Sequence, residues 1–129
     1  MNKTFVLLGC AFAALGVIIG AFGAHGLTPH LEAAQLKSFE TGVKYQMYHA
    51  IALILLGIIA AHINSKLINY SGVLFALGIS FFSGSIYMLS TRALTGLSVK
   101  WLGPITPIGG TMLIMAWILL FIAVLKSQN

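Results

Sequence analysis

Four long runs without Asp, Glu, Lys or Arg decide what this chain can fold into. They cover residues 4–24, 45–63, 68–89 and 105–125. A helix needs about 20 apolar residues to cross the hydrocarbon core of a bilayer, and each run is close to that length. The sequence therefore predicts an all-α integral membrane protein. We expect a four-transmembrane-helix bundle that forms one transmembrane domain over residues 1–129.

The composition favours the same class. Charged residues make up only 7% of the chain, whereas a soluble domain carries about 25%. Seven basic residues against two acidic ones give a net charge of +5. The basic residues stand singly between the apolar runs, as membrane-flanking lysines do. We therefore expect a multi-pass protein of the cell membrane, with membrane lipids as partners and no nucleic-acid partner.

Small residues recur along the first run, which is too long for a typical signal-peptide core and is interpreted as a retained span. Their spacing of four, three, four and three residues places them on one helix face. Such a face lets another backbone approach closely in lipid, within the protomer or in a homo-oligomer. The alternative is that glycine is simply common in membrane spans. The predicted helix-packing residues are Gly9, Ala13, Gly16, Gly20 and Gly23.

Two connections suggest irregular structure. Thr28 and Pro29 are typical of a helix start, which predicts a short interfacial helix between the first and second spans, with a bend at Gly42. The segment 103–110 contains two prolines and three glycines. That composition predicts a broken or widened start of the fourth span.

With four spans, the end of the first and third and the start of the second and fourth share one side of the membrane, and both termini share the other. This topology gathers polar residues at one face. The basic residues divide almost evenly between the two sides, so they do not determine orientation. The candidate binding cluster on the polar face consists of His25, Glu40, Lys44, Tyr45, His49 and Arg92.

Four ordered motifs resemble those of a known family. They are Gly20–Leu27, Thr41–Ala50, Phe82–Tyr87 and Gly103–Gly110. Together they are similar to the uncharacterised domain-of-unknown-function family 423, small bacterial inner-membrane proteins with relatives called transmembrane protein 256. The resemblance implies a multi-span membrane protein of about this length. It implies no activity and no catalytic residues.

Several chemistries are open to the polar face. Ionisable groups at membrane depth are costly and need partners, so Glu40 and Lys44 could form a helical ion pair while the histidines bind loop carbonyls. Alternatively, His25 and His49 could bind a metal or haem, although their spacing matches no metal-binding motif. Ser83 or Ser85 lacks the surrounding motif of a hydrolase nucleophile. We therefore expect no catalytic residue, no metal site and no cofactor.

Arg92 and Lys100 could hold an anionic lipid headgroup or simply anchor the chain at the interface. The leading hypothesis is a non-enzymatic accessory, lipid-binding or protein-interacting subunit. A small-solute transporter or channel entered through the polar face is the second, motivated by the irregular segment 103–110. A membrane enzyme or metal or haem carrier using His25 and His49 is the third.

Overall fold

The computed structural model describes residues 1–127, and the chain there is built from helices. The elements are α1 (Lys3–Phe22), the π-helix η1 (Gly23–Leu27), α2 (Ala33–Ile59), α3 (Lys66–Ser90), the short α4 (Arg92–Thr95), the 3₁₀ turn η2 (Lys100–Leu102) and α5 (Ile105–Lys126). Four of them, α1, α2, α3 and α5, are long and apolar enough to cross a membrane. The predicted all-α fold with four spans is confirmed.

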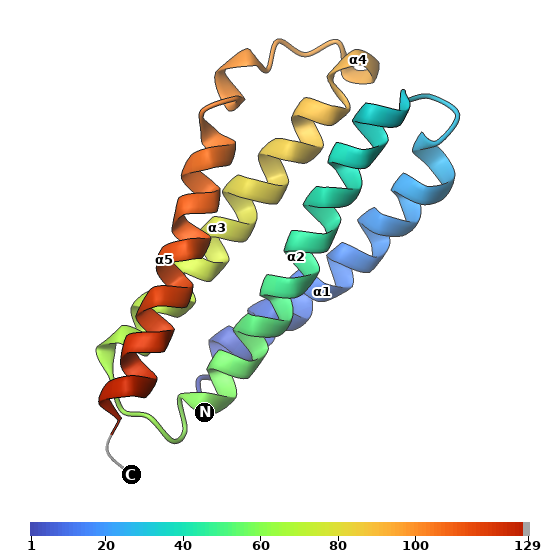
Figure 1. Ribbon diagram of the computed structural model, residues 1–129. Helices are drawn as coiled ribbons and strands as arrows, with labels where there is room; N and C mark the ends of the chain where they lie inside the picture. Colours follow the sequence, from blue (N-terminus) through green and yellow to red (C-terminus); the bar gives the residue numbers. More distant parts are fainter. Residues whose placement is uncertain (128–129) are drawn as a thin grey trace.

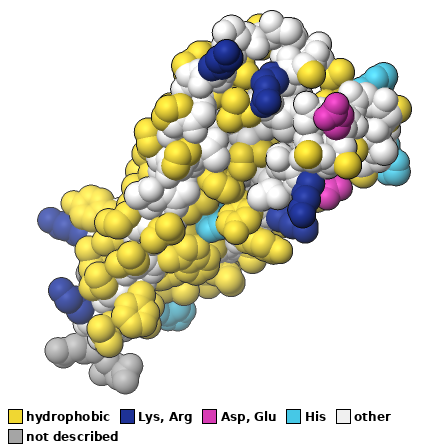
Figure 2. All heavy atoms as spheres, turned by 45° about the horizontal axis from the view of Figure 1, so that its top comes forward, with side chains coloured by type: hydrophobic (Ala, Val, Ile, Leu, Met, Phe, Trp, Pro, Cys, Tyr) yellow, Lys and Arg dark blue, Asp and Glu magenta, His cyan; other side chains and the backbone are white. Residues whose placement is uncertain are grey.

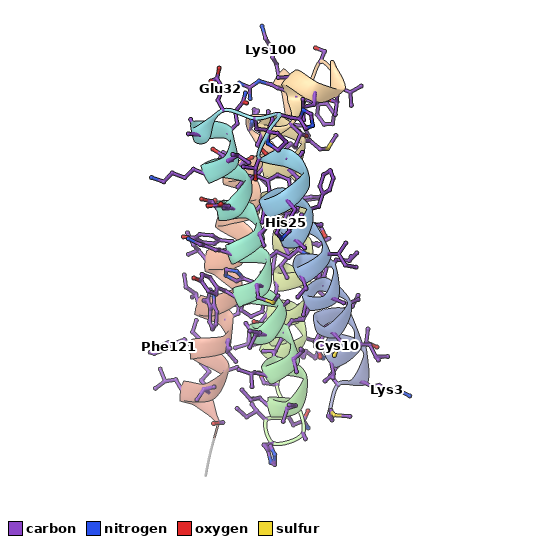
Figure 3. The ribbon with its side chains drawn as sticks, turned by 90° about the vertical axis from the view of Figure 1, so that its right-hand side faces the viewer. Lys3, Cys10, His25, Glu32, Lys100 and Phe121 are labelled. Atoms are coloured by element: carbon purple, nitrogen blue, oxygen red, sulfur yellow. The ribbon has the colours of Figure 1, made fainter. Side chains whose placement is uncertain are left out.

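The four long helices lie side by side and alternate in direction, with the start of α1 and the end of α5 at the same end of the molecule (Figure 1). Lys3 lies at that end, and Glu32 and Lys100 lie at the other (Figure 3). The closely packed pairs are successive in sequence: α1 with α2, α2 with α3, and α3 with α5. The inner helix α2 buries 44% of its apolar window, whereas the outer helices bury 17% in α1 and 22% in α5. The two outer helices therefore present broad apolar faces to lipid.

The second span differs from the prediction. The expected short interfacial helix is not separate, because α2 runs unbroken from Ala33 to Ile59 and the polar segment forms its first turns. Glu32 starts the helix through a capping box: its side chain accepts the backbone N–H of Gln35, and its own N–H donates to Gln35 Oε1 at 3.2 Å. Thr28 is not the N-cap, since its hydroxyl donates to the Ala24 carbonyl at 2.6 Å and closes η1. At 1.5 Å per residue α2 is about 40 Å long, so its charged first turns extend beyond the hydrocarbon core.

Gly42 does not bend α2. A Cβ atom at this position would lie 2.8 Å from Cε1 of Tyr87 on α3. The Gly42 carbonyl accepts a hydrogen bond of 2.7 Å from the Ser83 hydroxyl. Glycine is present here because the two helices approach closely, and the helix remains regular.

The start of the fourth span is also regular, against the prediction of a broken start. Pro104 precedes the first helical residue and Pro107 is the third, within the turn whose N–H groups have no partner in any helix. The prolines therefore remove no intrahelical hydrogen bond. Gly109 is required for packing, because a Cβ atom there would overlap the Phe82 backbone of α3.

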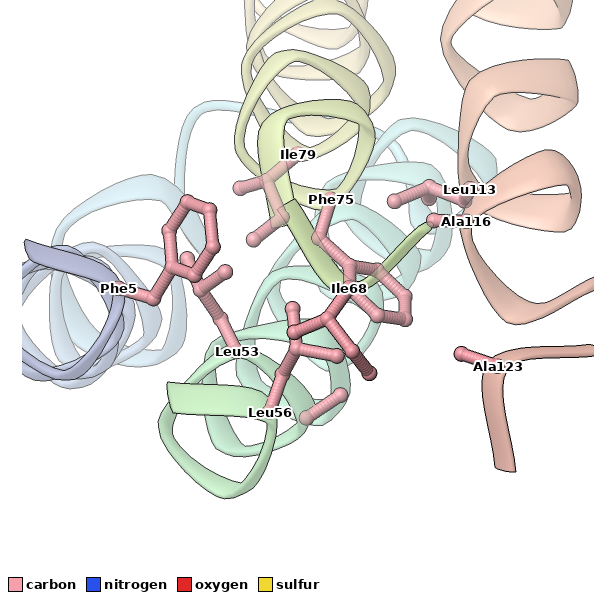
Figure 4. Packing of buried hydrophobic residues seen from close by; sticks show 10 residues of the cluster. Phe5, Leu53, Leu56, Ile68, Phe75, Ile79, Leu113, Ala116 and Ala123 are labelled. Atoms are coloured by element: carbon pink, nitrogen blue, oxygen red, sulfur yellow. The ribbon is translucent and has the colours of Figure 1, made fainter. Parts of the chain in front are cut away.

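The main hydrophobic core lies where α2, α3 and α5 meet, with Phe5 added from α1 (Figure 4). Its fully buried members include Leu53, Leu56 and Phe75. A side chain at Gly72 would overlap the Phe5 ring, so this glycine allows Phe5 of α1 to pack in the core. This core fixes the relative positions of α2 and α5 against their common neighbour α3.

The small-residue face of α1 packs within the protomer, against α2. A Cβ atom at Gly9 would lie 2.7 Å from the Ala50 carbonyl oxygen, and one at Gly23 would lie 2.6 Å from Cε1 of Phe39. Ala13 is half-buried on the same helix. The nearest atoms to a Cβ at Gly16 and Gly20 belong to Met47 and Val43, at 3.5 and 3.1 Å.

Candidate functional site: a groove between α2 and α5

The structure does not gather the predicted polar cluster into one site. Glu40 and Lys44 are exposed on α2, beside a shallow cavity against α1. His25 is exposed in η1. His49 is buried on the other side of α2, because nine residues at about 100° each turn it half a revolution from Glu40. Arg92 lies in α4, just beyond the end of α3.

His49 also lies farther from the start of its helix than expected. It is roughly 24 Å along α2 from Ala33 and roughly 15 Å from Ile59. Gly23 packs beside Phe39, so His25 lies near that level, about 15 Å above His49. The two histidines are therefore too far apart to bind one ion.

His49 connects α2 to α5. Its Nδ1 lies 2.6 Å from the Tyr45 carbonyl oxygen, and its Nε2 lies 3.1 Å from Nε1 of Trp117. A carbonyl accepts and an indole N–H donates, so the proton of a neutral imidazole must be on Nδ1. The ring meets Trp117 edge-on, with centroids 5.9 Å apart. Nδ1 bonds within α2 and Nε2 joins α5, so both nitrogens are engaged and Nε2 has no lone pair for a metal.

Other buried polar groups also join helices, apart from Ser90, whose hydroxyl donates to carbonyls of its own helix α3. Gln46 is 3% exposed; its Nε2 donates to the Phe12 carbonyl of α1 at 2.8 Å, and its Oε1 accepts the Tyr87 hydroxyl of α3 at 2.6 Å. Ser71 donates to the Ala116 carbonyl of α5 at 2.7 Å. Over the described residues, no buried side-chain nitrogen or oxygen lacks a partner. Sequence reasoning missed Gln46, although a lone amide within an apolar run is a signal of such a contact.

A cavity of about 380 Å³ opens between α2 and α5 at the depth of His49. The two helices rest on α3 at some distance from each other, and the ring of Phe82 from α3 lies between them. On the rim, Ile114 and Trp117 are 62% and 46% exposed, so the opening faces lipid. We call this the inner cavity; its lining is Tyr45, His49, Phe82, Gly110, Leu113, Ile114 and Trp117.

A second cavity, of about 530 Å³, follows along the same three helices toward the polar end. On α3 its lining begins one turn beyond Phe82, at Ile86, and on α5 it begins one turn before Gly110. The two cavities therefore succeed each other along one groove. We call this the outer cavity; its lining is Ala34, Gln35, Ser38, Ile86, Leu89, Ser90, Arg92, Gly103, Thr106 and Pro107.

The groove changes character along its length. The inner cavity is lined mainly by aromatic and aliphatic side chains, whereas the outer cavity carries a guanidinium, an amide and hydroxyls. On the face drawn in Figure 2, hydrophobic side chains cover the middle of the molecule, and most Lys and Arg side chains lie toward its ends. One face of α5 carries residues 110, 113, 114 and 117. This helical spacing is the sequence signal that could have indicated the inner cavity.

Metal binding finds no support in this geometry. Within residues 1–127, no group of three His, Cys, Asp or Glu side chains is placed to hold a metal ion. Ser83 donates to the Gly42 carbonyl, and Ser85 is hydrogen-bonded to the Thr106 hydroxyl. Neither serine bonds to His49.

Four apolar helices, charges at the two ends and an interior of satisfied polar contacts define a multi-pass membrane protein.

The chain belongs to the family described as protein of unknown function (DUF423), whose model matches residues 19–110. It is 45% identical over 124 residues to a UPF0382 membrane protein of Staphylococcus aureus (strain bovine RF122 / ET3-1), covering 96% of this chain and 97% of the relative.

A second relative, the UPF0382 membrane protein YwdK of Bacillus subtilis (strain 168), is 41% identical over 125 residues, covering 96% of this chain and 98% of the relative. No solved structure matches the chain. The relatives bear out a multi-pass protein of the cell membrane.

Proposed function

We propose that this protein is a non-enzymatic membrane protein that binds the acyl chain of a membrane lipid in the inner cavity. The observation that carries the proposal is an apolar cavity of about 380 Å³ that opens toward lipid at the middle of the spans. Hydrocarbon is the medium at that depth, so an acyl chain reaches the cavity without crossing water. The aromatic floor and aliphatic walls offer close contacts to such a chain.

The polar chemistry of the interior supports binding over catalysis. Both ring nitrogens of His49 are engaged, by Tyr45 and by Trp117. A general base needs a free lone pair beside the group that it deprotonates. The transporter alternative has also lost its motivation, since α5 begins as a regular helix.

Gly110 offers a way to test the proposal. A Cβ atom at Gly110 would lie 3.5 Å from Cδ2 of Phe82, which is ordinary contact. A larger side chain can therefore enter the inner cavity without moving the backbone, and the leucine of Gly110→Leu should occupy part of the cavity and obstruct an acyl chain. Thr111→Leu places the same side chain one position away, at an exposed residue outside the cavity lining.

The experiment is native mass spectrometry of the full chain after mild delipidation in detergent. The wild type and Thr111→Leu should each retain one phospholipid, and Gly110→Leu should lose it while keeping its unfolding temperature. A wild-type protein that retains no lipid would contradict the proposal. So would equal retention by both variants.

A further inference from the structure

The outer cavity suggests which lipid class the groove selects. It lies at the polar end of α2, α3 and α5, directly beyond the inner cavity. α3 ends at Ser90 after 25 residues, a length of about 37 Å that exceeds the hydrocarbon core of roughly 30 Å. Arg92 follows that end, so its guanidinium lies at the level of lipid headgroups.

We infer that the outer cavity binds the phosphate of an anionic phospholipid whose acyl chain lies in the inner cavity. This inference rests on the proposed function, because both cavities would hold parts of one molecule. The order of the cavities matches the order of the parts of a phospholipid, with a charged group at the interface and a hydrocarbon chain beneath it. Basic pockets between spanning helices on one side of a membrane bind headgroups in this manner.

The donors lining the outer cavity suit a phosphate group. Arg92 uses Nη1 to donate to the Leu89 carbonyl at 2.8 Å. A guanidinium carries five N–H donors, so the side chain retains donors for two phosphate oxygens. Ser38 contributes an exposed hydroxyl and Gln35 an amide. Arginine can bind phosphate through two parallel hydrogen bonds, which a lysine cannot reproduce.

The charge balance favours an anion over a zwitterion. The chain has two acidic residues, Glu32 and Glu40, and neither lines the outer cavity. The Glu32 side chain is occupied in capping α2. The positive charge of Arg92 therefore has no acidic neighbour within the lining. The first turn of α5, which has no side-chain cap, adds its partial positive charge at the same place, opposite the partial negative charge at the end of α3, where Arg92 donates to the Leu89 carbonyl.

The inference is tested by native mass spectrometry of the full chain with equal amounts of phosphatidylglycerol and phosphatidylcholine. One basic residue at a membrane surface changes the affinity for an anionic lipid by about fivefold. The wild type should prefer phosphatidylglycerol by about that factor. Arg92→Gln should bind the two lipids equally, and Arg92→Lys should keep part of the preference. Lys37→Gln is the matched control, since Lys37 is an exposed basic residue of α2 outside the lining.

The outcomes separate this inference from the proposed function. Lipid retained by the wild type without preference, or a preference lost equally in Lys37→Gln and Arg92→Gln, would overturn the headgroup assignment and leave acyl binding intact. No retained lipid would overturn both. The last experiment measures the unfolding temperature with inorganic phosphate in place of lipid. If phosphate raises the unfolding temperature of the wild type but not of Arg92→Gln, and no lipid does so, the cavity binds a soluble anion and the lipid assignment is wrong.

Discussion

α2 meets α1 on one side and α5 on another. We call the interface between α1 and α2 the tight seam and the interface between α2 and α5 the open seam, and the two are built in opposite ways. Toward α1, glycines bring the two backbones together, so that a Cβ atom at Gly9 would lie 2.7 Å from a carbonyl oxygen of α2. Toward α5, the helices stand apart, and the contact is made by the long side chains of His49 and Trp117. Small residues close most of the first seam and leave only the shallow cavity of about 200 Å³ beside Glu40 and Lys44. Large residues bridge the second seam and leave a groove beside them. The polar side chain of His49 serves this helix contact, so a polar residue within a span does not by itself indicate a functional site.

The tight seam should be the more sensitive to added volume. In Gly9→Leu the new side chain meets the Ala50 carbonyl and Ile54, which belong to the body of α2 and cannot move aside. Overpacking of this kind costs about 1–3 kcal/mol or more. We expect a large fall in the free energy of unfolding, measured by denaturation in mixed micelles.

Cys10→Leu is the control for that change, because Cys10 is the neighbouring residue of α1 and is exposed. It should leave the free energy of unfolding nearly unchanged. Equal effects of the two substitutions would show that α1 and α2 do not approach as closely as described.

The hydrogen bonds of Gln46 should contribute the next largest effect. Gln46→Leu keeps the apolar volume but leaves the Phe12 carbonyl and the Tyr87 hydroxyl without their partner. Interhelical hydrogen bonds in membranes contribute about 0.6 kcal/mol on average and up to about 1.7 kcal/mol. We expect a loss of about 1–2 kcal/mol for the two bonds.

A double-mutant cycle with Tyr87→Phe sharpens the result. The phenylalanine removes only the hydroxyl that donates to Gln46 Oε1. The double variant should therefore be less destabilised than the sum of the two single variants. Simple additivity would mean that this bond does not contribute.

The bridge across the open seam should matter least for stability. Trp117→Phe removes the indole N–H that donates to His49 Nε2 at 3.1 Å but keeps an aromatic ring against Phe75. We expect a loss of about 0.6 kcal/mol. The matched control is Trp101→Phe, since Trp101 is 66% exposed and lies outside both cavities. A loss as large as that of Gly9→Leu would contradict the distinction between the two seams.

The sequence predicts the spans well because charge-free runs report directly on the cost of burying charge in hydrocarbon. It predicts the position of His49 poorly. Glu40 and Lys44 look like the end of a membrane span, so the second span was expected to begin at Tyr45, whereas α2 begins at Ala33 and includes both residues. That error of about three turns moved His49 from the middle of the helix to near its start.

Other features lie outside what a single sequence can report. His49 and Trp117 are 68 positions apart, and their hydrogen bond depends on how two helices rotate against α3. Pro104 and Pro107 looked like helix breakers because their composition was considered without the register of the helix start. The groove was not predicted for the same reason, since its lining comes from three separate helices.

The central claim is that the seam between α2 and α5 holds a lipid while the seam between α1 and α2 does not. The most direct measurement is a crystal structure of the protein grown with a phospholipid brominated on its acyl chain, in which bromine is located by its anomalous signal. The account predicts a bromine peak beside Gly110 and Trp117, within the inner cavity. Bromine found only along the outer faces of α1 and α5, with the inner cavity filled by rearranged side chains, would contradict it.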